Sequence, residues 1–153
     1  MANCPIDDLE KALQPIGLWR RRAQSLKGLA TFAAENHGRF PISDQELTKV
    51  PAVGQYVANA IMMFQHGIAR PLLDVNMARV LERVVRSRRL ADIRHDPWLQ
   101  QASHFLVKGD NAAVTNWATL DFAAIVCSAR APECNACPFQ KSCSHALNAK
   151  TSS

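Results

Sequence analysis

Four of the five cysteines are gathered in one short stretch near the end of the 153-residue chain. They are Cys127, Cys134, Cys137 and Cys143, and six, two and five residues separate neighbours. Thiolates at such short spacing usually hold a metal centre, because a single loop can wrap all of them around one small object. The fifth cysteine, Cys4, stands alone near the opposite terminus.

Disulfides, a zinc ion and an iron–sulfur cluster are the three alternatives for this loop. Disulfides are the weakest, since no secretory signal precedes the chain and Cys4 has no partner. Zinc sites with four cysteines tend to use two separated Cys-x-x-Cys pairs, whereas this loop has one, Cys134 and Cys137. One loop that supplies four sulfurs suits the corners of a [4Fe–4S] cubane. The spacing therefore favours the cluster and leaves zinc as the alternative.

The charge balance indicates a polyanionic partner. Lys and Arg outnumber Asp and Glu by 18 to 13, and the pI is about 9.2, which favours nucleic acid. Two arginine clusters strengthen this reading: Arg20, Arg21 and Arg22, and then Arg79, Arg83, Arg86, Arg88 and Arg89. No apolar run reaches membrane-spanning length and no targeting segment is evident, so we expect an intracellular, reducing compartment.

Helix signals run along the chain and strand alternation is absent, so the predicted fold class is all-α. Five of the seven expected helices begin at a proline or at a residue whose side chain can cap them, and Gly38 and Gly67 mark two ends. The expected helices span residues 6–13, 18–36, 43–49, 55–65, 75–86, 96–106 and 111–125, with starts at Pro5, Ser43, Asp74, Asp96 and Asn111.

The turn Val50-Pro-Ala-Val-Gly54 joins two of these helices. It is similar to the hairpin of a helix–hairpin–helix element, whose usual form is Leu-Pro-Gly-Val-Gly. A tight turn before a helix start leaves backbone N–H groups that can bind a DNA phosphate without reading sequence, here at Val53, Gly54 and Gln55. Ala52 stands where the first glycine is usual. If that position requires positive φ, Ala52 carries strain.

This hairpin, the segment Leu72-Leu-Asp74-Val-Asn76-Met-Ala-Arg79-Val80 and the cysteine loop follow one another in an order that resembles the endonuclease III superfamily of DNA glycosylases. The resemblance extends from about Asp7 to about His145. It implies a base-excision repair enzyme that flips a mispaired or damaged nucleotide out of double-stranded DNA and cleaves its N-glycosidic bond. It also makes the four cysteines ligands of a [4Fe–4S] cluster, which holds a basic loop against DNA.

The resemblance implies two lobes with DNA between them. Residues 1–73 would form a helical-barrel lobe with the helix–hairpin–helix at about 43–66, residues 74–147 the cluster lobe, and residues 148–153 a polar tail. The basic DNA contacts expected on this reading are Arg79, Arg130 and Lys141.

Asp74 and Tyr56 are the candidate catalytic residues. Loss of a base leaves an electron-poor, oxocarbenium-like sugar, which a carboxylate can stabilise while it orients or deprotonates a water. The resemblance places the family's catalytic aspartate at Asp74, which is also the expected helix cap. Bifunctional members carry a lysine at position 56, whose amine forms a Schiff base with the sugar. Tyr56 cannot, so we predict a monofunctional glycosylase.

A tyrosine at position 56 together with Asp74 is similar to the thymine glycosylases that act on G·T mismatches, so the expected substrate is thymine or uracil opposite guanine. The segment Leu120-Asp121-Phe122-Ala-Ala-Ile-Val-Cys127 resembles the same branch. The alternative is an adenine glycosylase of the MutY type, which usually carries serine at position 56.

Members of the family begin with several helices that have no counterpart here. They complete the barrel, supply a residue that fills the gap left by the flipped base, and in adenine glycosylases carry a catalytic glutamate. Two hypotheses follow. One is an active glycosylase, monomeric when another segment completes it. The other is a truncated, catalytically weak DNA-binding remnant, which would expose apolar helix faces.

Overall fold

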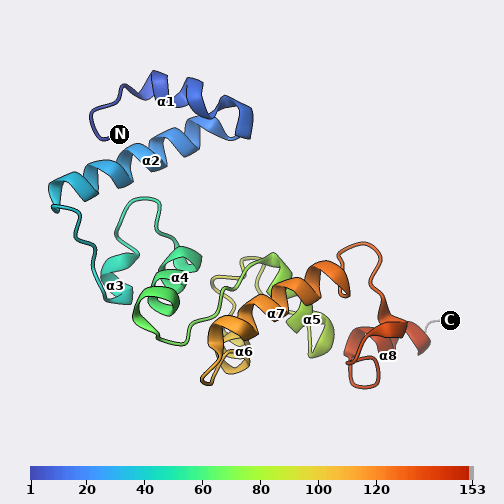
Figure 1. Ribbon diagram of the computed structural model, residues 1–153. Coiled ribbons are helices and arrows are strands. Elements are labelled where there is room, and N and C mark those ends of the chain that lie inside the picture. The colour runs from blue at the N-terminus through green and yellow to red at the C-terminus, as the bar shows by residue number, and fades with distance from the viewer. Residues whose placement is uncertain (152–153) are drawn as a thin grey trace. The chain divides into compact units, whose positions relative to one another are not determined.

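The computed structural model describes residues 1–151, and side chains through Asn148. The described residues form helices and no strand, which confirms the all-α prediction (Figure 1). The chain divides into two compact units, Met1–Ala58 and Asn59–Ser153. The sequence placed its division later, at 73/74, and those lobe boundaries stay a prediction.

The first unit contains three helices and a short 3-10 turn. Helix α1 (Ile6–Leu13) begins after Pro5 and packs against the long helix α2 (Trp19–Glu35). The 3-10 helix η1 (Gln14–Ile16) joins them, and Gly17 follows it at φ 68°. Helix α3 (Asp44–Leu47) begins at Ser43, whose hydroxyl accepts a hydrogen bond from the N–H of Glu46, as the capping box predicts.

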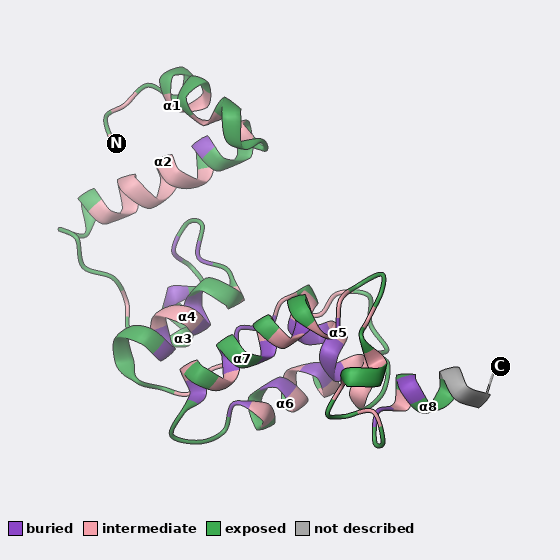
Figure 2. Cartoon of the chain, turned by 45° about the vertical axis from the view of Figure 1, so that its right-hand side comes forward, coloured by how far each residue is buried: buried purple, intermediate pink, exposed green. Residues whose placement is uncertain are grey.

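Helix α4 (Gln55–His66) leads from the first unit into the second. There α5 (Val75–Val84) contacts α6 (Pro97–Leu106), α7 (Ala112–Ile125) and α8 (Ser144–Thr151). The short 3-10 helix η2 (Cys134–Ala136) lies in the cysteine loop. Figure 2 shows α5 among the most buried segments. The core around it consists of Met63, Leu72, Leu73, Met77, Ala78, Leu81, Leu99, Val107 and Ala112.

Four local predictions need correction. Helix α5 ends at Val84 rather than at residue 86, and α3 ends at Leu47 rather than at residue 49. Asn111 precedes α7, but its side chain makes no capping hydrogen bond. The stretch expected as a polar tail from residue 148 continues helix α8 as far as Thr151, and residues 152–153 lie outside the described part of the chain. Helix α8 begins directly after Cys143, in a stretch with too few apolar residues to signal a helix by periodicity.

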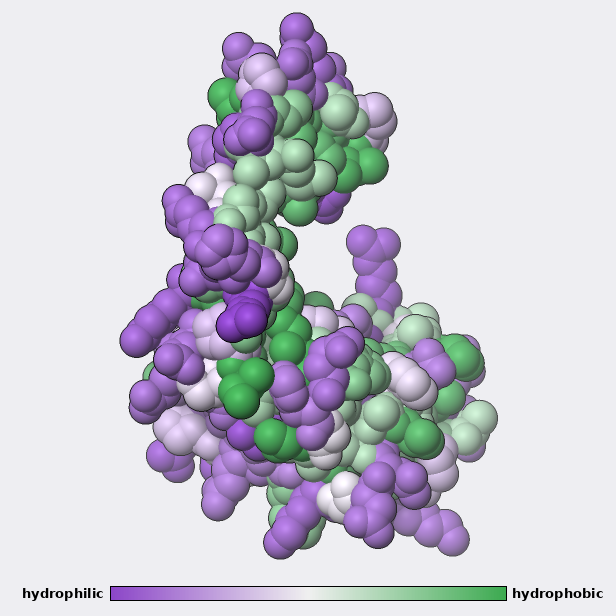
Figure 3. All heavy atoms as spheres, turned by 60° about the vertical axis from the view of Figure 1, so that its left-hand side comes forward, coloured by the Kyte–Doolittle hydropathy of each residue, from purple (hydrophilic) through white to green (hydrophobic). Residues whose placement is uncertain are grey.

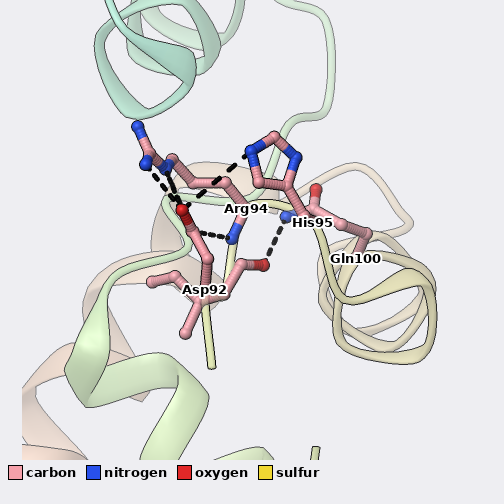
Figure 4. Close-up of polar contacts among 5 residues, drawn as sticks. Asp92, Arg94, His95 and Gln100 are labelled. Carbon is pink, nitrogen blue, oxygen red and sulfur yellow. Dashed lines mark hydrogen bonds and ion pairs between the residues drawn. The ribbon is translucent and has the colours of Figure 1, made fainter. Parts of the chain in front are cut away.

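Two aspartates shape the connection between α5 and α6. Asp92 accepts hydrogen bonds from the side chain and backbone of Arg94, which hold the pKa of its carboxyl far below the usual range (Figure 4). Asp96 caps α6 by accepting from the N–H of Leu99, and it also accepts from the N–H groups of Leu90 and Arg89. These bonds lower the pKa of Asp96. Its stabilising effect is therefore present above the usual aspartate pKa and is lost as the pH falls through the lowered value.

Hydrophobic side chains also reach the surface of both units, as one face shows in Figure 3. In the second unit an open groove of about 910 Å³ runs between α5, α6 and α7, lined mostly by apolar side chains that include Phe105 and Val114. None of the described helices combines the length and the hydropathy that a membrane span needs.

Candidate functional site

The hairpin between α3 and α4 adopts the strained turn that its sequence predicts. Ala52 has φ 65°, the left-handed region that favours glycine. The turn is closed by the N–H of Val53, which donates to the carbonyl of Val50 at 3.1 Å. Helix α2 packs close beside it, because a Cβ added at Gly28 would lie 3.0 Å from the Cβ of Pro51. Gly28 has no side chain and therefore leaves room for the hairpin beside α2.

Replacing Ala52 by glycine is expected to stabilise the protein. Alanine pays a steric cost at positive φ that glycine does not. Removal of this cost outweighs the larger entropy that glycine gives the unfolded chain, by about 0.5–1 kcal/mol. For a chain of this size the melting temperature should rise by roughly 2–4 °C, which thermal denaturation followed by circular dichroism would measure. Ala58→Gly, inside α4 and buried, is the matched control and should destabilise. A lower melting temperature for Ala52→Gly would contradict the argument.

The hairpin offers fewer phosphate-binding groups than the sequence suggested. Because the N–H of Val53 is used within the turn, it is removed from the proposed DNA contacts. The first hydrogen bond of α4 runs from the N–H of Ala58 to the carbonyl of Gly54 at 2.9 Å. The backbone around Gly54 and Gln55, at the positive end of the α4 dipole, therefore remains in the proposal.

Leu18 is a feature of the first unit that sequence reasoning missed. It precedes α2 with φ 49°, and its side chain is 72% exposed. A strained, exposed leucine is costly, and such strain concentrates at functional sites. The three arginines of the first turns of α2 follow it directly, and all three are exposed. The available sequence signal was the glycine before an apolar residue and a basic run, Gly17-Leu18-Trp19-Arg20.

Asp74 caps α5, as predicted. One carboxylate oxygen, Oδ1, accepts from the N–H groups of Asn76 and Met77, both at 2.9 Å. The other, Oδ2, accepts from the side-chain amide of Asn76 at 2.7 Å. The carboxylate is half-buried. Three hydrogen bonds thus fix its direction at the N-terminus of a buried helix.

Two buried asparagines hold the extended segment that leads to Asp74. The side chain of Asn116, fully buried in α7, accepts from the N–H of Leu72 at 2.6 Å and donates to the carbonyls of Arg70 and Ala112. Asn59 of α4 donates to the carbonyl of Pro71 at 2.8 Å. The bonds to Arg70, Pro71 and Leu72 satisfy backbone groups that lie outside any helix. They fix the backbone of the segment that leads to Asp74.

A chain of hydrogen bonds runs from Asp74 to the first cysteine of the loop. Asn76, which donates to Asp74, accepts from Nη1 of Arg79 at 3.1 Å. The Nε of Arg79 donates to the carbonyl of Cys127 at 2.9 Å, and its Nη2 donates to the carbonyl of Ala123 at 2.8 Å. The candidate catalytic carboxylate and the cysteine loop are therefore held by the same arginine.

These contacts give Arg79 a structural role that the sequence did not suggest. Its partly buried guanidinium donates to the carbonyls of Ala123 and Cys127 at the end of α7, so the DNA contact expected of Arg79 stays a prediction. A cation is favourable there because the last carbonyls of a helix have no partners within it. The other two basic candidates, Arg130 and Lys141, are exposed. Tyr56, in the first turn of α4, is 41% exposed.

All four cysteines of the loop line one small pocket of the second unit, together with residues of α5, α7 and α8. None of these cysteines is joined to another in the structure. Among the described residues no three Cys, His, Asp or Glu side chains form a group that could hold a metal ion. Four thiols around one pocket are a donor set that suits a [4Fe–4S] cluster or a zinc ion.

No protein-family model matches the sequence, but individual proteins do. The chain is 34% identical over 147 residues to a thymine-DNA glycosylase of Aeropyrum pernix, in an alignment that covers 94% of this chain and 66% of that protein. It is 34% identical over 142 residues to a thymine/uracil-DNA glycosylase of Pyrobaculum aerophilum, covering 90% and 62%. The chain therefore spans slightly less than two thirds of the length of these relatives.

Solved structures show the same likeness. A thermostable thymine-DNA glycosylase superposes with a TM-score of 0.81 at 28% identity, covering 96% of this chain and 68% of that one. A trapped endonuclease III–DNA covalent intermediate gives a TM-score of 0.83 at 23% identity, covering 97% and 69%, and supports the fold alone. Likeness of this extent in sequence and in fold means that the chain belongs to the endonuclease III superfamily of DNA glycosylases.

Proposed function

We propose that the protein is a monofunctional base-excision repair glycosylase that hydrolyses the N-glycosidic bond of thymine or uracil opposite guanine. The observation that carries the proposal is the Asp74 carboxylate, held by three hydrogen bonds at the start of α5. The relatives that are about 34% identical are named as thymine and thymine/uracil glycosylases. We expect the enzyme to be intracellular and to act as a monomer when complete.

The proposed chemistry needs a fixed negative charge and a water. As the base leaves, positive charge develops on the sugar, and a preorganised carboxylate stabilises it without having to move. Asp74 meets this requirement because its cap hydrogen bonds fix the carboxylate in one orientation. The same carboxylate orients the water that attacks the sugar and accepts its proton.

Cys127, Cys134, Cys137 and Cys143 would hold a [4Fe–4S] cluster, which their common pocket and free thiols support. When bound, the cluster would supply structural cross-linking of the loop rather than chemistry at the base. The exposed Arg130 and Lys141 would then be carried by a rigid loop toward the DNA backbone.

The first unit supplies the other DNA contacts in this proposal. The backbone at Gly54 and Gln55 binds a phosphate, and Arg20, Arg21 and Arg22 neutralise others. Leu18, exposed beside these arginines, acts as an apolar wedge that enters the base stack, as apolar side chains do in proteins that distort DNA.

Leu18→Ala is expected to lower base excision by roughly tenfold or more, because unstacking a base costs a few kcal/mol and the wedge offsets part of that cost. Single-turnover excision from a G·T duplex would measure it. Ile16→Ala is the matched control, since Ile16 is the last residue of η1, two positions before Leu18, and is 56% exposed without positive φ. Equal excision rates for the two variants would contradict the proposed contact between Leu18 and DNA.

The reaction type rests on Tyr56, which has no amine. With G·T or G·U duplexes we expect base release that leaves an intact abasic strand, so that breaks appear only after alkali, and borohydride traps no covalent complex. Tyr56→Lys should gain some trapping if position 56 faces the sugar. Efficient trapping by the unmodified protein, abolished by Lys49→Ala, would overturn the monofunctional assignment.

Two other assay results would assign the protein to a different branch or class. Release of adenine from A·G, without action on G·T or G·U, would assign the protein to the MutY-type branch. Salt-sensitive DNA binding with no release of any base would instead support the second class, the catalytically weak DNA-binding remnant.

A further inference from the structure

The four cysteines of the loop are not equivalent. Cys127 and Cys143 are buried, with 9% and 7% of their surface exposed, whereas Cys134 and Cys137 are only partly buried. The loop segment that carries the second pair is hydrogen-bonded within itself, by the N–H of Cys137 to the carbonyl of Cys134 and by the N–H of Gln140 to the carbonyl of Cys137. The first pair instead contacts α5.

Arg83, in the last turn of α5, contacts both buried cysteines. Its Nη1 donates to the carbonyl of Ser128 at 2.7 Å and lies 3.5 Å from Sγ of Cys127, and its Nη2 donates to the carbonyl of Ala129 at 2.9 Å. The backbone carbonyl of Arg83 accepts from Sγ of Cys143 at 3.2 Å. One residue thus links two thiols that are sixteen positions apart in the sequence.

A second bond keeps Cys143 in place after its thiol is deprotonated. When a thiol binds iron its proton passes to solvent, so the bond from Cys143 to the Arg83 carbonyl is lost. The hydroxyl of the next residue, Ser144, donates to the carbonyl of Val85 at 2.7 Å and still holds the chain at the end of α5.

We propose that Arg83 and the C-terminal end of α5 hold Cys127 and Cys143 as an anchored ligand pair, so that the metal centre is loaded and lost from the side of Cys134 and Cys137. The inference rests on the proposed cluster site. Arg83 acts in it as a positioning residue, because its fork of donors fixes the backbone from Cys127 to Ala129 while its own carbonyl faces Cys143.

The test follows the four thiols while the centre is dismantled. Protein purified anaerobically with its iron is treated with an iron(II) chelator, samples are alkylated with iodoacetamide at intervals, and each cysteine is quantified by mass spectrometry. Cys134 and Cys137 should be alkylated severalfold earlier than Cys127 and Cys143. In Arg83→Ala, Cys127 should react early, together with Cys134 and Cys137, because the donors to its backbone are gone. Cys143 should still react late, since the carbonyl of residue 83 and the bond from Ser144 remain. The iron absorbance should decay faster than in the unmodified protein.

Two further variants keep the test decisive. Arg83→Lys retains the charge but not the fork of donors, so it should show an intermediate order even where Arg83→Ala folds poorly. Arg86→Ala is the control, since that guanidinium stacks over the ring of Trp98 at 4.7 Å and should leave the order unchanged.

Equal alkylation of all four cysteines in the unmodified protein would overturn the inference, and so would an unchanged order in a folded Arg83→Ala. Protein that purifies without iron would count against the proposed cluster alone. The alkylation order of that metal-free chain would then still decide whether Cys127 and Cys143 are anchored.

Discussion

Asp74→Asn is expected to lower base excision by roughly 10²–10⁴-fold, the range typical of a lost acid–base group, while mismatched DNA is still bound. Asparagine caps helices about as well as aspartate, so the N–H groups of Asn76 and Met77 keep an acceptor. What disappears is the negative charge that stabilises the developing sugar cation, together with the hydrogen bond from the side-chain amide of Asn76 to Oδ2. Single-turnover excision from a G·T duplex and a parallel binding titration measure the two effects separately.

Asp96→Asn is the matched control for capping. Asp96 caps α6 as Asp74 caps α5, but its second oxygen accepts from the N–H groups of Arg89 and Leu90. An amide nitrogen there would face two donors, so this variant should lose thermal stability while it keeps excision activity at temperatures where it stays folded. If Asp74→Asn instead excises at the unmodified rate, the role of Asp74 is confined to capping.

Cys137→Ser is expected to remove the metal centre. Unmodified protein purified anaerobically should be brown and contain about four irons and acid-labile sulfide per chain. The serine variant should lose most of this iron and melt at a lower temperature, because binding of a structural metal centre contributes directly to folding. Iron and sulfide analysis, the visible absorption spectrum and thermal denaturation provide the measurements.

Cys4→Ser supplies the comparison within the same chain. Cys4 belongs to the first unit, where its carbonyl accepts a hydrogen bond from Lys27, and it lies outside the four-cysteine loop in the sequence. This variant should retain its iron. If the unmodified protein contains stoichiometric zinc and neither iron nor sulfide, the cluster is wrong and the loop is a zinc site, the alternative that the cysteine spacing left open.

The sequence by itself determined the elements of the fold and most candidate positions. Capping side chains at Ser43, Asp74 and Asp96 form hydrogen bonds within three residues, so these three predicted helix starts are confirmed by contacts that the sequence encodes locally. At Ala52 the sequence indicated strain only if the position has positive φ, and the structure shows that it does. The grouping of four cysteines in one loop was also visible from spacing alone.

Tertiary structure decided which side chains face one another. The sequence marks Arg79 as a DNA contact and Arg83 as a member of a basic cluster, and both bind carbonyls that follow them by 44 to 48 positions. No sequence pattern identified Asn116, although its side chain holds the segment before Asp74 through a hydrogen bond to Leu72, 44 positions away. Periodicity and capping report only neighbours within a turn or two, and a basic residue has the same local pattern whether it meets a phosphate or a helix end. The packing of α7 against α5 supplies these arginines with partners inside the chain, because it brings the unpaired carbonyls at the end of α7 next to them.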